Sequence, residues 1–333
     1  MNFDRMRDRD LRKEAKKRGL RRYSYLNKAQ LIQYLMTGDH PIPPNHVLIP
    51  DGRSEPAILS ENKFQVIPSD SDLILPSDTS PGNFSVKQIL HGDCLSFLPS
   101  MPDSVFDCCI ADPPFNMSQK KGLGWAFSSH VTMQEGWDIF SKDEYVQFTL
   151  DWVTEILRVV KRNGNIFVFG SFHSIFTLGF IMQNIFDRRI ITQIVWYKPN
   201  AQPNITCRMF TESTEFILWA VNNESKKAKK WTFNYHTMKS MNNNKQMRNM
   251  WEIPLTKPTE RKHGKHPSQK PLQIVERLVL AGTNEGDFIL DPFSGTGTTG
   301  VAAEKHNRKW VMIEKEESYN QIAQKRLDEL SEQ

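Results

Sequence analysis

Cysteine is scarce in this sequence, and no long apolar run occurs. The four cysteines include an adjacent pair and show no CxxC spacing; they are Cys94, Cys108, Cys109 and Cys207. This pattern fits neither a disulfide scaffold nor a structural zinc site, and it predicts a reducing compartment. No stretch reaches the ~18 apolar residues of a membrane span, and the first part of the chain is charged rather than apolar. The sequence therefore predicts neither a membrane span nor a secretory signal.

Basic residues are concentrated in two segments. The net charge is +5 over 333 residues. Residues 1–36 carry eleven Lys or Arg against four Asp or Glu, and residues 198–265 carry thirteen against five, so the rest of the chain is acidic. Clustered cations favour a polyanion such as nucleic acid, because binding releases condensed counterions. The alternative is a pair of solvated basic faces.

The N-terminal segment has two short stretches of helical pattern, at 7–19 and 28–36. Their apolar positions are Leu11 and Ala15 in the first stretch, and Leu31, Ile32 and Leu35 in the second. The string LRKEAKKRGLRRYSYLNKAQLIQYL resembles the small helical DNA-binding modules of the SAP and Rho N-terminal type. We therefore expect a basic helical module at 1–37; the alternative is a helical hairpin that packs on the main domain. Residues 38–84 are rich in Pro, Ser and Asp without a clear period, which predicts a linker.

From residue 85 onward, short apolar runs alternate with amphipathic stretches. The apolar runs are 105–111, 165–170, 190–197, 215–221, 287–291 and 310–314, and the amphipathic stretches are 143–161, 270–282 and 316–330. Continuous apolar strands separated by helices predict an α/β fold, a doubly wound and mostly parallel sheet covered on both faces. Residues 85–333 would form this domain. The basic range 198–265, polar above all at 222–265, would be an insert in it.

One strand end has the pattern of a cofactor site, in DFILDPFSGTGTTG. Asp291 follows the strand, Gly295 and Gly297 allow close backbone approach, and a helix should begin near Thr298. A Walker phosphate loop is a poor alternative because no Lys follows the second glycine. Glu314, at the end of the next strand, is placed to accept both hydroxyls of a ribose. The sequence favours a nucleoside-bearing cofactor over the alternative, a tight structural turn with a solvated Glu314.

A second strand end carries DPPF, in VFDCCIADPPFN. The two prolines stiffen the backbone after Asp112 and have no N–H to occupy neighbouring carbonyls. The Asp112 carboxylate and the Pro113 carbonyl would form a pair of acceptors for an amino group, with Phe115 as a stacking plane. This arrangement suits the exocyclic amino group of a flipped base. The alternative is a proline turn that simply ends a strand.

Together, DPPF and DPFSGTGTTG resemble the S-adenosylmethionine-dependent amino-methyltransferases of DNA. DPPF precedes the cofactor turn with a basic insert between them, which is the circularly permuted, beta-type order. Further matches are GDCLSFLPSMPDSVFD, GWDIFSKDEY, GKHPSQKP and EKEESYNQIAQKRL, so the resemblance covers about residues 87–330. It implies a Rossmann-like methyltransferase fold. The segments FGSFHSIF, WYKPNAQPNITCRMFTESTEFILWA and NNNKQMRNMWEIP resemble the GATC N6-adenine methylases of restriction–modification systems, a type that tolerates a single-stranded target.

The resemblance implies methyl transfer to adenine N6 within GATC, without a metal. The implied catalytic residues are Asp112, Pro113, Pro114 and Phe115. Among the implied S-adenosylmethionine contacts, Asp93 would bind the cofactor's adenine, Glu314 its ribose, and Ser268 and Lys270 would lie near its methionine carboxylate. The other implied contacts are Cys94, Asp291, Pro292, Phe293, Ser294, Gly295, Gly297, Thr298 and Thr299. The insert 198–265 would recognise the target, with Arg208, Lys227, Lys230, Arg248 and Lys265 as DNA contacts. Residues 116–137 would form a loop over the flipped base, with Trp137 anchoring its end.

Several alternatives stay open. An N4-cytosine methylase shares the acceptor logic, although such enzymes more often begin the tetrapeptide with Ser. RNA or protein methylation, or a non-catalytic DNA-binding regulator, would also retain parts of the pattern. C5 methylation is disfavoured because no Pro-Cys occurs, and Cys108 and Cys109 are expected in the core. The expected partner is DNA, double-stranded and also single-stranded, and a homodimer is left open. No membrane association is expected. The expected location is the cytoplasm or another reducing compartment that contains DNA.

Overall fold

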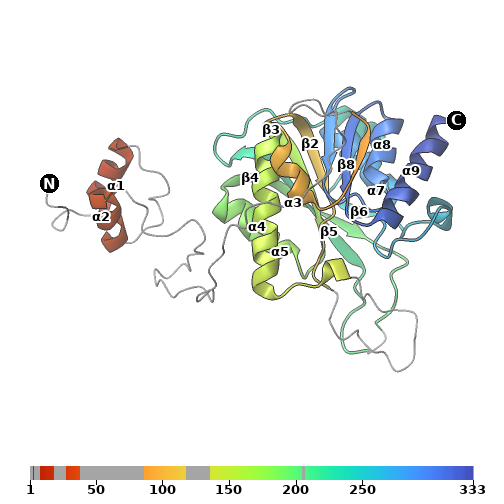
Figure 1. The fold of residues 1–333 in the computed structure, drawn as a ribbon, viewed down its shortest axis with the longest axis horizontal. Helices are drawn as coiled ribbons and strands as arrows, with labels where there is room; N and C mark the ends of the chain where they lie inside the picture. The colour runs from red at the N-terminus through yellow and green to blue at the C-terminus, as the bar shows by residue number, and fades with distance from the viewer. Residues whose placement is uncertain are drawn as a thin grey trace, which may run out of the picture. The chain divides into compact units, whose positions relative to one another are not determined.

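The chain folds into two compact units, Met1–Asp72 and Leu73–Gln333. A computed structural model describes residues 3, 8–18, 28–37, 86–117, 136–204 and 207–332 (Figure 1). The predicted linker 38–84, and residues 118–135 of the predicted loop, lie outside these described residues. Among the described helices, none combines the length and the apolar character that crossing a membrane would require.

The first unit contains a pair of short helices, α1 (Asp8–Lys17) and α2 (Lys28–Thr37). The predicted apolar stripes meet in one small cluster, in which Phe3 and Tyr34 join Leu11, Ala15, Leu31 and Leu35, with Ile32 at its edge. Arg18 contributes to the closure of the pair. Its guanidinium lies 5.1 Å from the centre of the Phe3 ring and donates to the Leu35 carbonyl at 2.9 Å. Both predicted helices are therefore present and pack on each other.

The second unit is built on an eight-stranded sheet with the order β1-β8-β7-β2-β3-β5-β4-β6. Only β5 runs against its neighbours; the other adjacent pairs are parallel. The strands in sheet order are β1 (Gln88–His91), β8 (Lys309–Glu314), β7 (Phe288–Asp291), β2 (Phe106–Ala111), β3 (Val160–Gly170), β5 (Thr214–Glu224), β4 (Arg188–Tyr197) and β6 (Met250–Glu252). The predicted mostly parallel sheet is confirmed.

Helices cover both faces of this sheet (Figure 1). One face carries α3 (Cys94–Phe97), η2 (Leu98–Ser100), α4 (Lys142–Val159), α5 (Ile175–Phe180) and η4 (Ile181–Ile185). The other carries α7 (Leu272–Gly282), α8 (Thr298–Lys305) and α9 (Glu317–Ser331). The remaining short elements are η3 (Gly136–Asp138), α6 (Tyr235–Ser240) and η5 (Pro258–Arg261). The fold is therefore doubly wound, as the sequence predicts.

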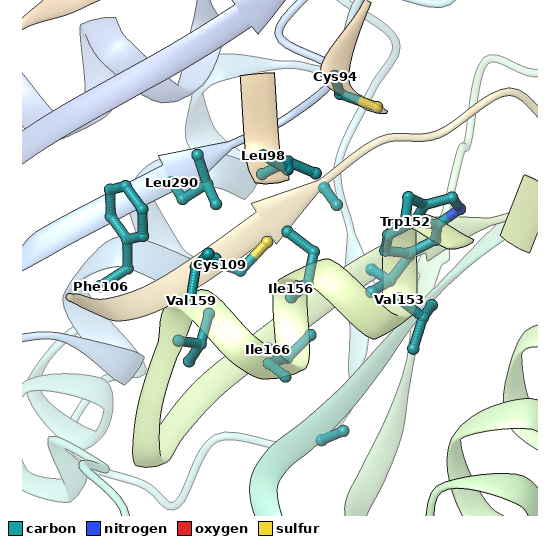
Figure 2. Close-up of a cluster of buried hydrophobic side chains, with 14 of the residues drawn as sticks. Cys94, Leu98, Phe106, Cys109, Trp152, Val153, Ile156, Val159, Ile166 and Leu290 are labelled. Atoms are coloured by element: carbon teal, nitrogen blue, oxygen red, sulfur yellow. The ribbon is translucent and has the colours of Figure 1, made fainter. Parts of the chain in front are cut away.

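Strand β2 shows how the two cores form. Because side chains alternate along a strand, Cys109 packs in the core under α4 while Cys108 packs in the core on the opposite face. Figure 2 shows Trp152 and Ile156 of α4 among the buried side chains around Cys109. Both cysteines are fully buried. They are core residues, as the sequence predicts, and β2 is the central strand that carries Asp112 at its end.

Helix α4 is fixed at both ends by side chains. Ser141 accepts from the Glu144 N–H at 3.3 Å, and the Glu144 carboxylate accepts from the Ser141 N–H at 2.7 Å, which is a capping box. Near its last turn, Arg158 donates to the Leu98 carbonyl and to Asp103, both at 2.6 Å. These contacts hold α4 in place at both of its ends.

The predicted insert 198–265 is not a single excursion from the sheet, because it includes β5 and β6. Thr214, at the start of β5, pairs with Tyr197 at the end of β4, and Glu224 pairs with Arg188 at its beginning. The two ends of β5 therefore lie at opposite edges of the sheet. The segment before β5 lies at the carboxyl edge of the parallel strands, and the segment after it lies at the amino edge.

Candidate active site

The carboxyl ends of β1, β8, β7 and β2 surround one cavity of about 340 Å³. This is the place where open parallel sheets bind ligands. All but one of the predicted catalytic and cofactor residues line it: Asp93, Cys94, Asp112, Pro113, Pro114, Phe115, Ser268, Lys270, Asp291, Pro292, Phe293, Ser294, Gly295, Thr298, Thr299 and Glu314. The exception is Gly297. The two strand ends singled out in the sequence thus open into the same cavity.

Gly295 and Gly297 both have left-handed backbones, with φ of +50° and +75°. At Gly295 an added Cβ would lie 3.7 Å from the His266 ring, which is ordinary contact, and its N–H donates to Glu314 at 2.6 Å. At Gly297 a Cβ would lie 2.7 Å from the Cβ of Ala323 in α9. Gly297 therefore lets α8 start close against α9, and it is not among the described residues that line the cavity; its predicted cofactor contact stays a prediction.

Glu314 links the glycine turn to the segment after β8. Its Oε2 accepts from Gly295, and its Oε1 accepts from the Glu316 N–H at 2.8 Å. Burial raises the pKa of this carboxyl above its ordinary value, against those hydrogen bonds. Each oxygen retains a second lone pair. The side chain is held in one orientation at the cavity wall.

Asp291 and Ser294 lie beneath the turn. Asp291 is buried and accepts from the Phe293 N–H at 3.0 Å, and burial raises its pKa to about 7. The buried Ser294 hydroxyl has no hydrogen-bond partner among the described residues. A buried polar atom without a partner costs about 1–3 kcal/mol. The hydroxyl therefore suits a polar ligand in the cavity.

Asp93 and Cys94 form the wall of the cavity after β1. Asp93 caps α3 by accepting from the Leu95 N–H at 2.9 Å, and its other oxygen is 3.3 Å from Lys315 Nζ. Cys94 is buried, which raises the pKa of its thiol well above the ordinary value. The thiol is thus a neutral wall group, and Asp93 is the polar group at this position.

Asp112 uses its two carboxylate oxygens differently. Oδ2 accepts from Lys270 Nζ at 2.6 Å, whereas the buried Oδ1 has no partner among the described residues. Burial raises the pKa of Asp112 to about 6, although Lys270 acts in the opposite direction. The following backbone is fixed because Tyr145 donates to the Pro114 carbonyl at 3.0 Å and Asp138 accepts from the Asn116 N–H at 2.6 Å.

Lys270 pairs with Asp112 across the cavity. Its ammonium lies at Asp112 rather than at the glycine turn, 5.0 Å from the centre of the Phe115 ring and 5.4 Å from that of Phe169. Burial lowers its pKa, but Asp112 and Glu215 outweigh burial and hold the pKa above its ordinary value. Two carboxylates thus converge on the ammonium in the half of the cavity around DPPF. The methionine-carboxylate contact that the resemblance implies stays a prediction.

The rim of the cavity carries an aromatic group around His266. Its ring lies 5.8 Å from Trp137 in a stacked arrangement and 4.3 Å from Tyr319, edge on. Burial, together with Lys270 and Arg261, lowers the pKa of His266 to about 3, so the ring is neutral. Its Nδ1 accepts from the Ser268 N–H at 3.2 Å. Trp137, predicted to anchor the loop, stacks on His266 in this group.

The structure separates the predicted DNA contacts. Arg208 is exposed in the segment between β4 and β5 at the carboxyl edge, and exposed Lys265 precedes the cavity residue His266. Lys227 and Lys230 follow β5 at the amino edge, away from the cavity, and Lys227 pairs with Glu224 at 2.7 Å. Arg248 precedes the edge strand β6. The structure therefore brings only Arg208 and Lys265 to the edge that holds the cavity.

Sequence reasoning missed Glu215, Trp196 and Phe169, which also line the cavity. Glu215 is the first residue of the predicted strand run 215–221, and an acidic side chain at the start of an apolar strand is the one signal that could have pointed to it. Phe169 and Trp196 are indistinguishable from core residues in the sequence. Both are indeed buried, and they contribute to core and cavity at once.

A family model described as DNA methylase, the N6/N4 methyltransferases, matches residues 106–325. The chain belongs to this family. The Type II methyltransferase M2.DpnII of Streptococcus pneumoniae is 42% identical over 242 residues, covering 72% of this chain and 89% of that protein. M2.MboI of Moraxella bovis is 36% identical over 252 residues, covering 75% and 89%. The predicted resemblance is confirmed, and this methylase acts on DNA.

Solved structures agree with the family. The M1.HpyAVI–SAM complex is 29% identical with a TM-score of 0.54, covering 72% of this methylase and 98% of that chain. The cytosine-N4-specific PvuII DNA methyltransferase is 18% identical with a TM-score of 0.56, covering 73% and 91%. The second likeness shows the fold alone. Both support the methyltransferase form of the α/β sheet predicted from the sequence.

Proposed function

We propose that this methylase transfers a methyl group from S-adenosylmethionine to N6 of an adenine within GATC. The observation that carries the proposal is Asp112 Oδ1, which has no partner within the described part of the chain and lies in the same cavity as the Gly295 turn. An acceptor for a base amino group and a cradle for a nucleoside cofactor thus meet in one site. The GATC target is supported by the insert segments and by the identity to M2.DpnII and M2.MboI.

The cofactor half of the cavity fits S-adenosylmethionine. Ser294 offers a hydroxyl that no described residue engages, and Gly295 leaves the turn without a side chain. Glu314 is fixed with lone pairs available for a ribose. Asp93 would accept from the cofactor's adenine, and Asp291 would lie beneath the methionine part. When bound, S-adenosylmethionine supplies an electrophilic methyl group on a sulfonium.

The base half of the cavity supplies acceptors and a stacking plane. Adenine N6 is a weak nucleophile because its lone pair is delocalised into the ring. Asp112 Oδ1 and the Pro113 carbonyl accept hydrogen bonds from its two N–H groups, which favours a pyramidal nitrogen with the lone pair directed outward. Phe115 stacks on the base, and such stacking contributes about 1–3 kcal/mol to binding. Holding both reactants in one cavity supplies much of the acceleration.

Target recognition is assigned to the segments on the carboxyl edge. Arg208 and Lys265 are the first candidates for DNA contact because they lie at the edge that holds the cavity, and Arg248 on the sheet edge is the next. We extend the substrate to single-stranded GATC, on the likeness to methylases that tolerate it. The homodimer and the reducing compartment stay predictions.

The test uses the full-length protein with labelled S-adenosylmethionine and two duplexes that differ only in GATC against GTAC. Nucleoside analysis should find N6-methyladenine in the GATC duplex alone, and a single-stranded GATC oligonucleotide should also be modified. N4-methylcytosine as the product would replace the adenine assignment. Unmodified DNA with a cofactor-bound protein would overturn the proposed reaction.

A further inference from the structure

Four charged side chains form a row of alternating sign behind the base half of the cavity. Lys198 Nζ lies 3.2 Å from Glu215 Oε1, Lys270 Nζ lies 3.5 Å from Glu215 Oε2, and the Lys270–Asp112 distance is 2.6 Å. The row crosses from the end of β4, through the start of β5 and the segment before α7, to the end of β2. None of the four side chains is more than about a fifth exposed.

Such a row needs an explanation other than stability. Removing charges from water costs several kcal/mol per ion, and a buried ion pair is often no more stabilising than apolar side chains of the same size. The Lys270 side chain is 5% exposed, and its surroundings include the rings of Phe115 and Phe169, where an apolar side chain would be accommodated. The charge therefore has a use at this position.

The geometry indicates that use. Lys270 occupies Oδ2 of Asp112, and Oδ1 is the oxygen for which the described residues provide no partner. Glu215 approaches Lys270 from β5, and the Ser268 carbonyl accepts from the same ammonium at 3.1 Å. These contacts define where the ammonium lies and so which way the Asp112 carboxylate turns.

We propose that Lys270 and Glu215 are a positioning pair for Asp112: Lys270 orients and neutralises the carboxylate, and Glu215 holds Lys270 in place. The inference rests on the proposed function, in which Asp112 Oδ1 accepts from the amino group of the base. Neither residue has this role in the resemblance, which places Lys270 at the methionine carboxylate and gives Glu215 no role.

The charges around Asp112 give the pair opposite signatures in a pH profile. Burial raises the pKa of Asp112, Lys270 lowers it, and Glu215 and Asp138 raise it further. Asp291 also faces Asp112 from β7. Because Asp112 must be ionised to act as the acceptor, the rate of methyl transfer should fall as the pH drops through about 6. This fall is the acidic limb of the pH profile. Loss of Lys270 moves this limb to higher pH, and loss of the Glu215 charge moves it to lower pH.

The experiment measures single-turnover methylation of the GATC duplex against pH for wild type, Lys270→Met and Glu215→Gln. We expect the acidic limb to move up by about one pH unit in Lys270→Met and down in Glu215→Gln, with lower plateau rates in both. Glu215→Asp, which keeps the charge, should leave the limb near the wild-type position. Lys262→Met, which removes an exposed lysine paired with Glu329, is the matched control.

The outcomes separate the pair from the proposed function. Opposite movements of the limb support the pair. Lower plateaus with an unmoved limb in both variants would show that the row is only structural, and would overturn it. If Lys270→Met fails to fold by circular dichroism, Glu215→Gln and Glu215→Asp decide alone. If wild type does not methylate adenine, the proposed function fails first, whatever the limbs do.

Discussion

At the scale of single residues, Asp112 and Gly295 line one cavity, and the proposed function gives them different tasks. Asp112→Ala should lower methyl transfer by at least about 10²-fold, because the acceptor for the amino group is lost. S-adenosylmethionine binding should stay close to wild type, because the glycine turn and Glu314 are untouched. Rates on the GATC duplex and calorimetric titration of the cofactor measure the two effects. A collapse of cofactor binding would contradict the division.

Asp291 gives a pH dependence of stability. Burial raises its pKa from 3.8 to about 7. Because the folded state favours the protonated form, this group's stabilisation is present below about pH 4 and is lost as the pH rises through 7. Asp291→Asn cannot ionise and retains an oxygen that can accept from Phe293. Relative to wild type, its free energy of unfolding should increase between pH 4 and pH 8, by about 2–4 kcal/mol.

Urea unfolding of the cofactor-free protein at pH 4, 6 and 8 provides this measurement. A difference between variant and wild type that stays constant with pH would show that Asp291 does not titrate in this range. Glu314, whose pKa is also raised by burial, remains in both proteins and so cancels from the comparison.

The sequence predicts which residues carry the chemistry better than it predicts their partners. Asp112 and Gly295 stand in motifs whose residue types the chemistry demands, and both line the cavity. The pairing of Lys270 with Glu215 could not be predicted, because Glu215 comes from a strand whose direction the sequence does not specify. Gly297 shares a motif with Gly295, yet only the packing of α9 shows that its missing side chain makes room for Ala323.

At the scale of elements, the start of α8 depends on close approach to α9. Gly297→Ala should destabilise the protein, because it adds a Cβ at 2.7 Å from Ala323 to a residue with φ of +75°. Gly286→Ala is the matched control: its φ is +80°, but no atom of the described residues lies within 4 Å of the added atom. A left-handed backbone alone costs about 1–2 kcal/mol. The free energy of unfolding in urea should fall more for Gly297→Ala than for Gly286→Ala. Equal losses in the two variants would show that the contact between α8 and α9 does not contribute to the destabilisation.

The two edges of the sheet give a matched pair of basic residues. Arg208→Ala should weaken binding of a GATC duplex several-fold and reduce the slope of affinity against salt by about one. Lys227→Ala should change neither, because Lys227 lies at the opposite edge and is paired with Glu224. Fluorescence anisotropy at two salt concentrations measures both. Equal losses in the two variants would place the DNA across both edges.

Strands and helices with strong periodic patterns were predictable, and their direction was not. Six of the eight described strands follow apolar segments recognised in the sequence, and α4, α7 and α9 follow amphipathic stretches. The short edge strand β6 and the helix α6 have no such pattern. The antiparallel course of β5 arises from its pairing between β3 and β4. That pairing is tertiary information, and it divides the predicted insert between two edges.

At the scale of the whole molecule, the basic first unit and the catalytic unit are separate compact bodies in one chain. A tethered basic body raises the local DNA concentration without a new contact at the active site. Deleting residues 1–37 should weaken overall DNA affinity and flatten its salt dependence, while the methylated sequence and the turnover at saturating DNA stay similar.

Affinity measured over a salt series, with sequencing of the methylated DNA, checks the deletion. A changed target sequence would make the first unit part of recognition. Unchanged affinity at low salt would mean that its basic face is only solvated. Composition predicted this basic region and the two-helix pattern, and the packing of Leu11, Ala15, Leu31 and Leu35 agrees with it. Which partner the basic face binds is not encoded in that packing.

The antiparallel contact between β4 and β5 has a consequence for how target specificity can change. The Lys198 N–H donates to the Ser213 carbonyl at 2.7 Å, so the connection 199–212 is closed at its base by the sheet itself. Doubling the length of such a connection costs only about 0.6 kcal/mol. Evolution or an engineer can therefore exchange the Arg208 segment for another of different length and sequence. The strand register that holds Glu215 beside Lys270 would stay intact, so a methylase with a new target sequence could retain the same chemistry.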